Sequence, residues 1–167
     1  MGRLAANTCC HPVCGRNMGY THYWSFASDE GFSDEAWAAI VEAVGRVLEN
    51  SPVALSNETR VDDDAIVING AEPDDFETLV IRHDVSNTHA FGPMPHAGFV
   101  KTQWRPYDVV VCATLLILRT LSPDVITIYS DGEWDGEWIG ARALASNVLP
   151  DLAASFSEQS KLTPFPE

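Results

Sequence analysis

The hydrophobic and polar residues of this chain follow a two-residue period near the start and a helical period directly afterwards. Residues 19–26 alternate between two faces and are rich in aromatic side chains, which is typical of a strand. From residue 34 to about 49, apolar residues recur every three or four positions, as on a helix with one buried face. Ser33 is well placed to cap that helix, and Phe32 to pack against Trp37 in its first turn.

Short apolar runs separated by acidic turns that contain Gly or Pro fill the middle of the chain. These runs have the β-branched and aromatic content of strands, and they lie at residues 53–56, 65–70, 78–83 and 98–104. The stretch 87–98, which contains two Gly and two Pro, is predicted to be a loop.

The longest apolar run predicts a second helix, from Pro106 to about Leu121. It is apolar nearly all round, so we expect it to be central and covered on every side. Pro106 suits the first helical position, where its missing N–H costs nothing. Asp108 then falls at the third position, where a negative charge is favoured by the helix dipole. A strand at 125–130 and an amphipathic helix at 138–149 follow.

The predicted order of elements, β-α-β-β-β-β-α-β-α, lacks the regular alternation of a doubly wound parallel sheet. It predicts an α+β fold with a mixed, largely antiparallel sheet packed on the buried central helix and two amphipathic helices. With 167 residues the chain fits one domain, which we expect over residues 18–152. Residues 1–17 are predicted to be a flexible or mis-started leader, and residues 153–167 a loose tail.

The net charge of the chain limits the classes of partner that it can be expected to bind. The net charge is −14, and only two of the ten basic residues are lysines, Lys101 and Lys161. Nucleic acids are held by basic patches that this chain lacks, so we expect no nucleic-acid partner. A surface rich in Asp and Glu and poor in Lys is also favoured in a high-salt cytoplasm. No apolar run approaches the ~20 residues of a membrane span, and no secretory signal is recognisable, which predicts a cytoplasmic protein without membrane contact.

One string near the start has the residue types of a zinc site. Cys9, Cys10, His11 and Cys14 lie within six positions, but a structural zinc site needs a second pair of ligands at a loop's distance. No other cysteine lies nearby, so the sequence predicts no metal and no other cofactor. Cys112 lies inside the long apolar run and is interpreted as a core residue.

Three strings carry a resemblance to a known family. They are "MGYTHYW" at 18–24, "KT" followed by "PYD" within 101–108, and "SDG" at 130–132. Together they resemble an uncharacterised family of small proteins of bacteria and their phages, over about residues 18–149. The resemblance implies no established activity. This chain departs from the family's usual form, in which basic residues fill the gap that holds Gln103 and Trp104 here, and this weakens any shared anion site.

If the strands that carry these strings are neighbours, their side chains converge at one edge of the sheet, beside the start of the second helix. A helix start offers free N–H groups, and Lys101 adds a positive charge, so the place suits a phosphate or carboxylate. Aromatic faces there can stack on a base or a sugar. The chain is therefore predicted to bind a small anionic or nucleotide-like ligand, as a phage-type sequestering protein would. The predicted ligand-binding residues are His22, Tyr23, Trp24, Lys101, Thr102, Tyr107, Asp108, Ser130 and Asp131.

Other interpretations of these residues stay open. Lys101 and Asp108 can form a surface ion pair, and strand aromatics are commonly core residues. The tandem "DGEW" at 131–138 suggests exposed tryptophans and hence a protein-interaction adaptor. An enzyme with His22 as base and Asp131 as acid is the least supported class, because no motif of a common hydrolase, metalloprotease or nucleotide-binding enzyme is present. We assign no catalytic residue.

Overall fold

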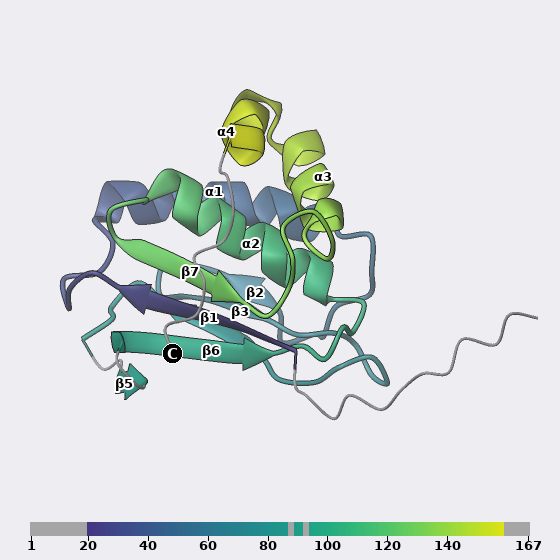
Figure 1. The fold of residues 1–167 in the computed structure, drawn as a ribbon, viewed down its shortest axis with the longest axis horizontal. Coiled ribbons are helices and arrows are strands. Elements are labelled where there is room, and N and C mark those ends of the chain that lie inside the picture. The colour runs from purple at the N-terminus through teal and green to yellow at the C-terminus, as the bar shows by residue number, and fades with distance from the viewer. Residues whose placement is uncertain (1–19, 87–88, 92–93, 159–167) are drawn as a thin grey trace, which may run out of the picture.

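The computed structural model describes residues 20–86, 89–91 and 94–158, and Figure 1 shows its arrangement. The strands are β1 (Thr21–Phe26), β2 (Arg60–Val61), β3 (Ala65–Ile68), β4 (Leu79–Arg82), β5 (His89–Phe91), β6 (Met94–Lys101) and β7 (Ile126–Ser130). The helices are α1 (Asp34–Glu49), α2 (Asp108–Leu121), α3 (Ile139–Val148) and α4 (Ala153–Glu158), with a 3-10 turn at Pro150–Leu152 between the last two.

The strands form two antiparallel sheets. The larger has the order β5-β6-β1-β7, so the first strand of the sequence lies inside it, and the smaller has the order β2-β3-β4. Figure 1 shows α1 and α2 on one side of the larger sheet. Between the sheets, side chains of β1 and β4 line a small cavity of about 180 Å³. The α+β class and the single compact domain are confirmed, although the strands divide into two sheets where one was predicted.

The predicted strand at 53–56 and the predicted loop at 87–98 were both wrong. Val53 to Ser56 make only an isolated bridge, Leu55 to Gly70, and the Ser51 hydroxyl donates to the C=O of Val53 and accepts from its N–H. The stretch predicted as a loop contains β5 and the first half of β6. β5 pairs with β6, and Ala97 and Gly98 pair with β1, which supplies the backbone hydrogen bonds that the Gly- and Pro-rich sequence does not suggest.

Helix α1 forms where its sequence signals place it. The Ser33 hydroxyl accepts from the N–H of Ala36, and the Phe32 ring packs against Trp37 with centroids 5.3 Å apart. One face of α1 is buried and the other is exposed. The Ser33 cap, the contact of Phe32 with Trp37 and the buried apolar face of α1 are all confirmed, because each is determined by residues close together in the sequence.

Helix α2 is the buried centre of the molecule, as predicted, with every side chain from Val110 to Leu118 buried. Its start differs from the prediction. Tyr107 is the N-cap and Asp108 the first helical residue, not the third, and Pro106 lies before the helix. The cause is a pair of tight turns, in which Arg105 N–H donates to Thr102 C=O and Asp108 N–H donates to Arg105 C=O.

The predicted last helix is confirmed as α3, but the chain does not become loose at residue 153. Helix α4 follows, and its Phe156 is completely buried against the core. Residues 159–167 and the expected leader at 1–17 lie outside the described residues. Within the described part of the chain, no helix has the length and apolar character needed to cross a membrane.

Candidate functional site

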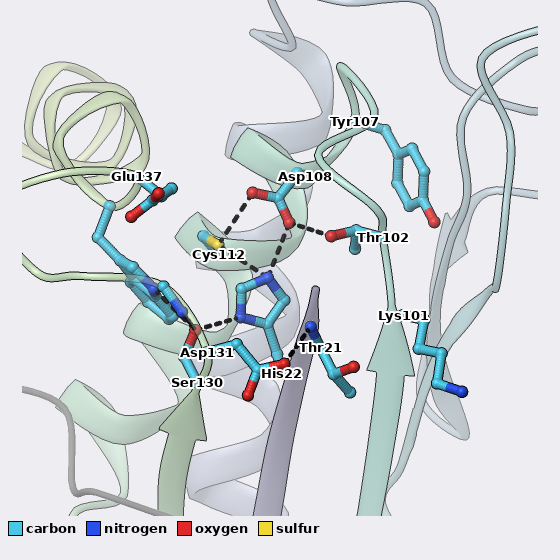
Figure 2. A network of polar contacts seen from close by, with 12 residues as sticks. Thr21, His22, Lys101, Thr102, Tyr107, Asp108, Cys112, Ser130, Asp131 and Glu137 are labelled. Carbon is cyan, nitrogen blue, oxygen red and sulfur yellow. Dashed lines mark hydrogen bonds and ion pairs between the residues drawn. The ribbon is translucent and has the colours of Figure 1, made fainter. Parts of the chain in front are cut away.

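The side chain of His22 lies at the centre of a polar network between the larger sheet and α2. It is wholly buried, and β1 directs it toward α2. Its Nε2 lies 2.7 Å from Asp108 Oδ1, and its Nδ1 lies 2.9 Å from Ser130 Oγ. Figure 2 shows the imidazole between these two groups. Three segments far apart in sequence are therefore joined by one ring: β1, the start of α2 and the end of β7.

The Asp108 carboxylate accepts from three side chains. Thr102 Oγ1 donates to Oδ1 at 2.5 Å, next to the bond from His22. Cys112 donates from Sγ to Oδ2 at 3.7 Å, and the same sulfur lies 3.4 Å from His22 Nε2. Asp108 and Cys112 are four residues apart on α2, so both face β1. The result is a group of one imidazole, one carboxylate and one thiol.

The hydrogen bonds of Ser130 determine which nitrogen of His22 carries the proton. Ser130 Oγ accepts from Gly132 N–H at 2.9 Å and from the Trp138 indole N–H at 3.2 Å. A hydroxyl has two acceptor positions and one donor, so its own hydrogen is left for His22 Nδ1. Nε2 then carries the imidazole proton and donates to Asp108. The donor and acceptor positions thus form a line from Ser130 through His22 to Asp108.

Asp131 lies beside this line but not in it. Its Oδ2 accepts the backbone N–H of Thr21 at 2.9 Å and fixes the end of β7 to the start of β1. The side chain is otherwise exposed. Its role in the described structure is to hold the strand ends, and among the described residues it makes no hydrogen bond to His22.

Tyr20 adds a buried hydroxyl that lacks a partner. Its ring lies edge-on to His22 with centroids 5.0 Å apart, and only 1% of the residue is exposed. A side chain at position 132 would collide with the Tyr20 hydroxyl, so Gly132 leaves the space it occupies. The hydroxyl has no hydrogen-bond partner of good geometry among the described residues. Native proteins rarely leave such a group unpaired.

The electrostatic environment of the network is negative. Burial raises the pKa of the Cys112 thiol well above its usual value, and the charges of Asp108 and Glu137 raise it further. Burial also raises the pKa of Tyr20, and the negative charges of Cys112, Asp108 and Glu137 raise it further. The Ser130 hydroxyl lowers the Tyr20 pKa by a smaller amount. No basic side chain of the described residues is among these causes. A cation would therefore be favoured here.

Besides Asp131, four predicted site residues are not brought to the network. Tyr23 lies on the opposite face of β1, next to Phe99. Trp24 shares the face of His22 but packs two residues away, with its indole over Gly98. Tyr107 is buried and donates to the C=O of Glu77 at 2.6 Å.

Lys101 is the fourth of these residues and is exposed, with its side chain pointing away from His22 in Figure 2. Its backbone N–H donates to the Glu77 carboxylate. The structure brings together His22, Thr102, Asp108 and Ser130, but without the cation expected beside them.

Three members of the site were missed from the sequence. Cys112 was interpreted only as core, although its spacing of four from Asp108 on a helix is a signal that could have found it. Tyr20 is two residues before His22 and thus on the same strand face, which is a weaker signal. Trp138 was expected to be an exposed tryptophan of the tandem repeat.

That expectation about the tandem repeat was wrong. Trp138 is completely buried, and its ring lies 5.6 Å from that of His22. Trp134 is partly buried and stacks on Trp138, with the Arg142 guanidinium over its other side. The tryptophan that is largely exposed is Trp104, at 53%. An adaptor surface made from the repeat therefore has no exposed indole of the kind predicted.

Comparison with family models, with curated proteins and with solved structures found no significant match to this chain. The geometry of the network is therefore the basis for a functional proposal.

Proposed function

We propose that this protein binds a divalent transition-metal ion, of which Zn²⁺ is the representative, through His22, Asp108 and Cys112. The observation that carries the proposal is that an imidazole nitrogen, a thiol sulfur and a carboxylate oxygen from these residues all lie within 4.8 Å of one another. Nitrogen, sulfur and oxygen of these types are the donors that zinc takes in proteins.

The distances between the three donors support this proposal. Zinc bonds of about 2.0–2.3 Å in tetrahedral geometry put two ligand atoms about 3.4–3.6 Å apart. Cys112 Sγ lies 3.4 Å from His22 Nε2 and 3.7 Å from Asp108 Oδ2, both near that range. His22 Nε2 and Asp108 Oδ1 are closer, at 2.7 Å, because a proton joins them. An ion would replace that proton and separate the two atoms by about 0.7–0.9 Å to reach that range.

The charge of the surroundings also favours a cation over an anion. Asp108 occupies the start of α2, where an anionic ligand would otherwise find free N–H groups and positive potential. Lys101 points away from the network. A small anionic or nucleotide-like ligand is thus supported less well by this geometry than a metal ion. Three protein ligands leave one position of a tetrahedral ion for water or another donor.

The resemblance to the bacterial and phage family remains a proposal of its own. Four of the positions that carry it, His22, Thr102, Asp108 and Ser130, are members of the network. If proteins with these strings are relatives, the same hydrogen-bonded group would be expected in them. Two of the four, His22 and Asp108, are proposed ligands, and the other two each bond to a ligand: Ser130 to His22 and Thr102 to Asp108.

The test must separate Cys112 from the cysteine-rich string near the start of the chain. The chain has four cysteines, so changing Cys9, Cys10 and Cys14 to serine leaves Cys112 as the only thiol. Cobalt(II) is the probe, because a cobalt–thiolate bond gives an absorption band that aqueous cobalt lacks. We expect this single-thiol protein to show the band at one equivalent of cobalt, and zinc to abolish it.

Variants assign the ligands. Cys112→Ala should remove the band, and His22→Gln should weaken cobalt binding by more than the 10–100-fold that is typical for losing a partner of a ligand. Asp131→Asn is the matched control, since Asp131 is an acidic neighbour that holds Thr21 and not His22. Circular dichroism of each variant establishes that it is folded. No thiolate band in the folded single-thiol protein would refute the proposed function.

A further inference from the structure

We infer that Tyr20 is a positioning residue whose hydroxyl is the hydrogen-bond acceptor that Ser130 takes up when His22 binds a metal ion. The inference rests on the proposed function, since it concerns the ion-bound state of the same site. It explains why the buried hydroxyl of Tyr20 has no hydrogen-bond partner although it lies near Ser130, whose hydroxyl has three.

The argument begins with the protons of the ion-free site. Ser130 Oγ accepts two N–H groups, from Gly132 and Trp138, and gives its hydrogen to His22 Nδ1. His22 Nε2 gives its hydrogen to Asp108. Every donor in this line has an acceptor, and the Tyr20 hydroxyl is not needed as one.

An ion at Nε2 reverses this arrangement. The ion takes the lone pair of Nε2, so the single proton of the neutral imidazole moves from Nε2 to Nδ1, where ligating histidines carry it. Nδ1 becomes a donor toward Ser130 Oγ, where the longest of the present bonds, that from Trp138 at 3.2 Å, is the one to yield. The hydrogen of the Ser130 hydroxyl can no longer point at Nδ1. It needs another acceptor inside a buried site.

Tyr20 is placed to be that acceptor. Its hydroxyl occupies the space left by the missing side chain of Gly132, whose N–H is bonded to Ser130 Oγ. The ring is fixed on both sides, edge-on to His22 and stacked on Trp104 with centroids 4.6 Å apart. The two hydroxyls do not meet hydrogen-bond geometry in the ion-free structure, so a small shift of the Ser130 or Tyr20 side chain must accompany the rotation of the serine hydroxyl.

The experiment compares two buried tyrosines in the single-thiol protein. Tyr20→Phe removes a hydroxyl without a partner, so the melting temperature of the ion-free protein should stay the same or rise. Cobalt affinity should fall about tenfold, or about 1.4 kcal/mol, because the serine hydroxyl then lacks an acceptor in the bound state. Tyr107→Phe should do the opposite: it breaks the bond to Glu77 and lowers the melting temperature, with cobalt affinity unchanged.

A double-mutant cycle tests whether Tyr20 acts through Ser130. In the Ser130→Ala background there is no hydroxyl to redirect, so Tyr20→Phe should not weaken cobalt binding further. A tenfold loss that persists in that background would contradict the inference, as would an unchanged affinity in Tyr20→Phe alone. Either result leaves the proposed metal site standing if the parent protein shows the cobalt–thiolate band. Absence of the band in the parent overturns both.

Discussion

The starts of α1 and α2 are built on opposite principles. At α1, Ser33 caps the helix with its side chain, and the first helical residue, Asp34, has a fully exposed side chain. At α2, the N-cap Tyr107 makes no capping bond, and the first helical residue, Asp108, has its carboxylate bonded to His22 and Thr102. The same acidic residue type at the same helical position thus serves the helix in one place and a buried network in the other. Departures from local rules of this kind are expected at functional sites.

The largest effect should come from the body of α2. Leu116 is completely packed, and Leu116→Ala should lower the free energy of unfolding by about 2–5 kcal/mol. Leu48→Ala in α1, where the leucine is only partly buried, should have a smaller effect. Urea denaturation measures both. A loss for Leu116→Ala below that for Leu48→Ala would mean that α2 is not the centre of the core.

The second largest effect is expected at the first residue of α2, and the first residue of α1 serves as the comparison. Asp108→Ala leaves the buried hydrogens of His22 and Thr102 without an acceptor and should cost about 1–3 kcal/mol. Asp34→Ala removes a fully exposed charge from a helix start, worth about 0.3–1 kcal/mol, together with its 3.5 Å contact to the His83 imidazole. The same denaturation experiment applies. Equal losses would show that the carboxylate of Asp108 acts only on the helix dipole.

The third effect belongs to the cap of α1. Ser33→Ala removes the acceptor of the Ala36 N–H and should cost about 0.5–2 kcal/mol. Ser33→Asp retains an acceptor and serves as the control, with stability close to that of the parent. If Ser33→Ala left the unfolding midpoint in place, the start of α1 would not depend on its cap, and the contrast with α2 would be lost.

Much of the fold follows from the sequence because its signals are local. The Ser33 cap, the contact of Phe32 with Trp37 and the apolar α2 each depend on residues close in the chain. The pairing of β1 with the second half of β6 joins residues about 70–80 positions apart, which no local signal shows, and β5 and the first half of β6 were missed in a stretch predicted as a loop.

The site shows the same division. His22, Asp108 and Ser130 were named from the sequence, but the proposed site does not include Lys101. Side chains alternate between the two faces of β6, and Lys101 lies on the solvent face while its neighbour Val100 is buried. Cys112 was missed because an apolar run hides a ligand whose partner lies one helical turn away. Strings of residues could thus indicate where the strands meet, but not which side chains point inward.

The smallest effect on stability is expected for Lys101, which was the main reason to predict an anionic ligand from the sequence. Its side chain is exposed and points away from the network, so Lys101→Met should change stability by less than ~0.5 kcal/mol. Cobalt affinity should also remain as in the parent. A marked fall in affinity for phosphate or a nucleotide, measured by calorimetry, would instead return support to an anionic ligand.

A crystal structure of the zinc-loaded single-thiol protein, with anomalous data collected on both sides of the zinc absorption edge, tests the central claim most directly. The account predicts an anomalous peak between β1 and α2, with zinc about 2.3 Å from Cys112 Sγ and about 2.0–2.1 Å from His22 Nε2. Asp108 should supply an oxygen ligand in place of its present bond to the imidazole. An ordered site without a peak, with His22 still bonded to Asp108 at saturating zinc, would contradict it.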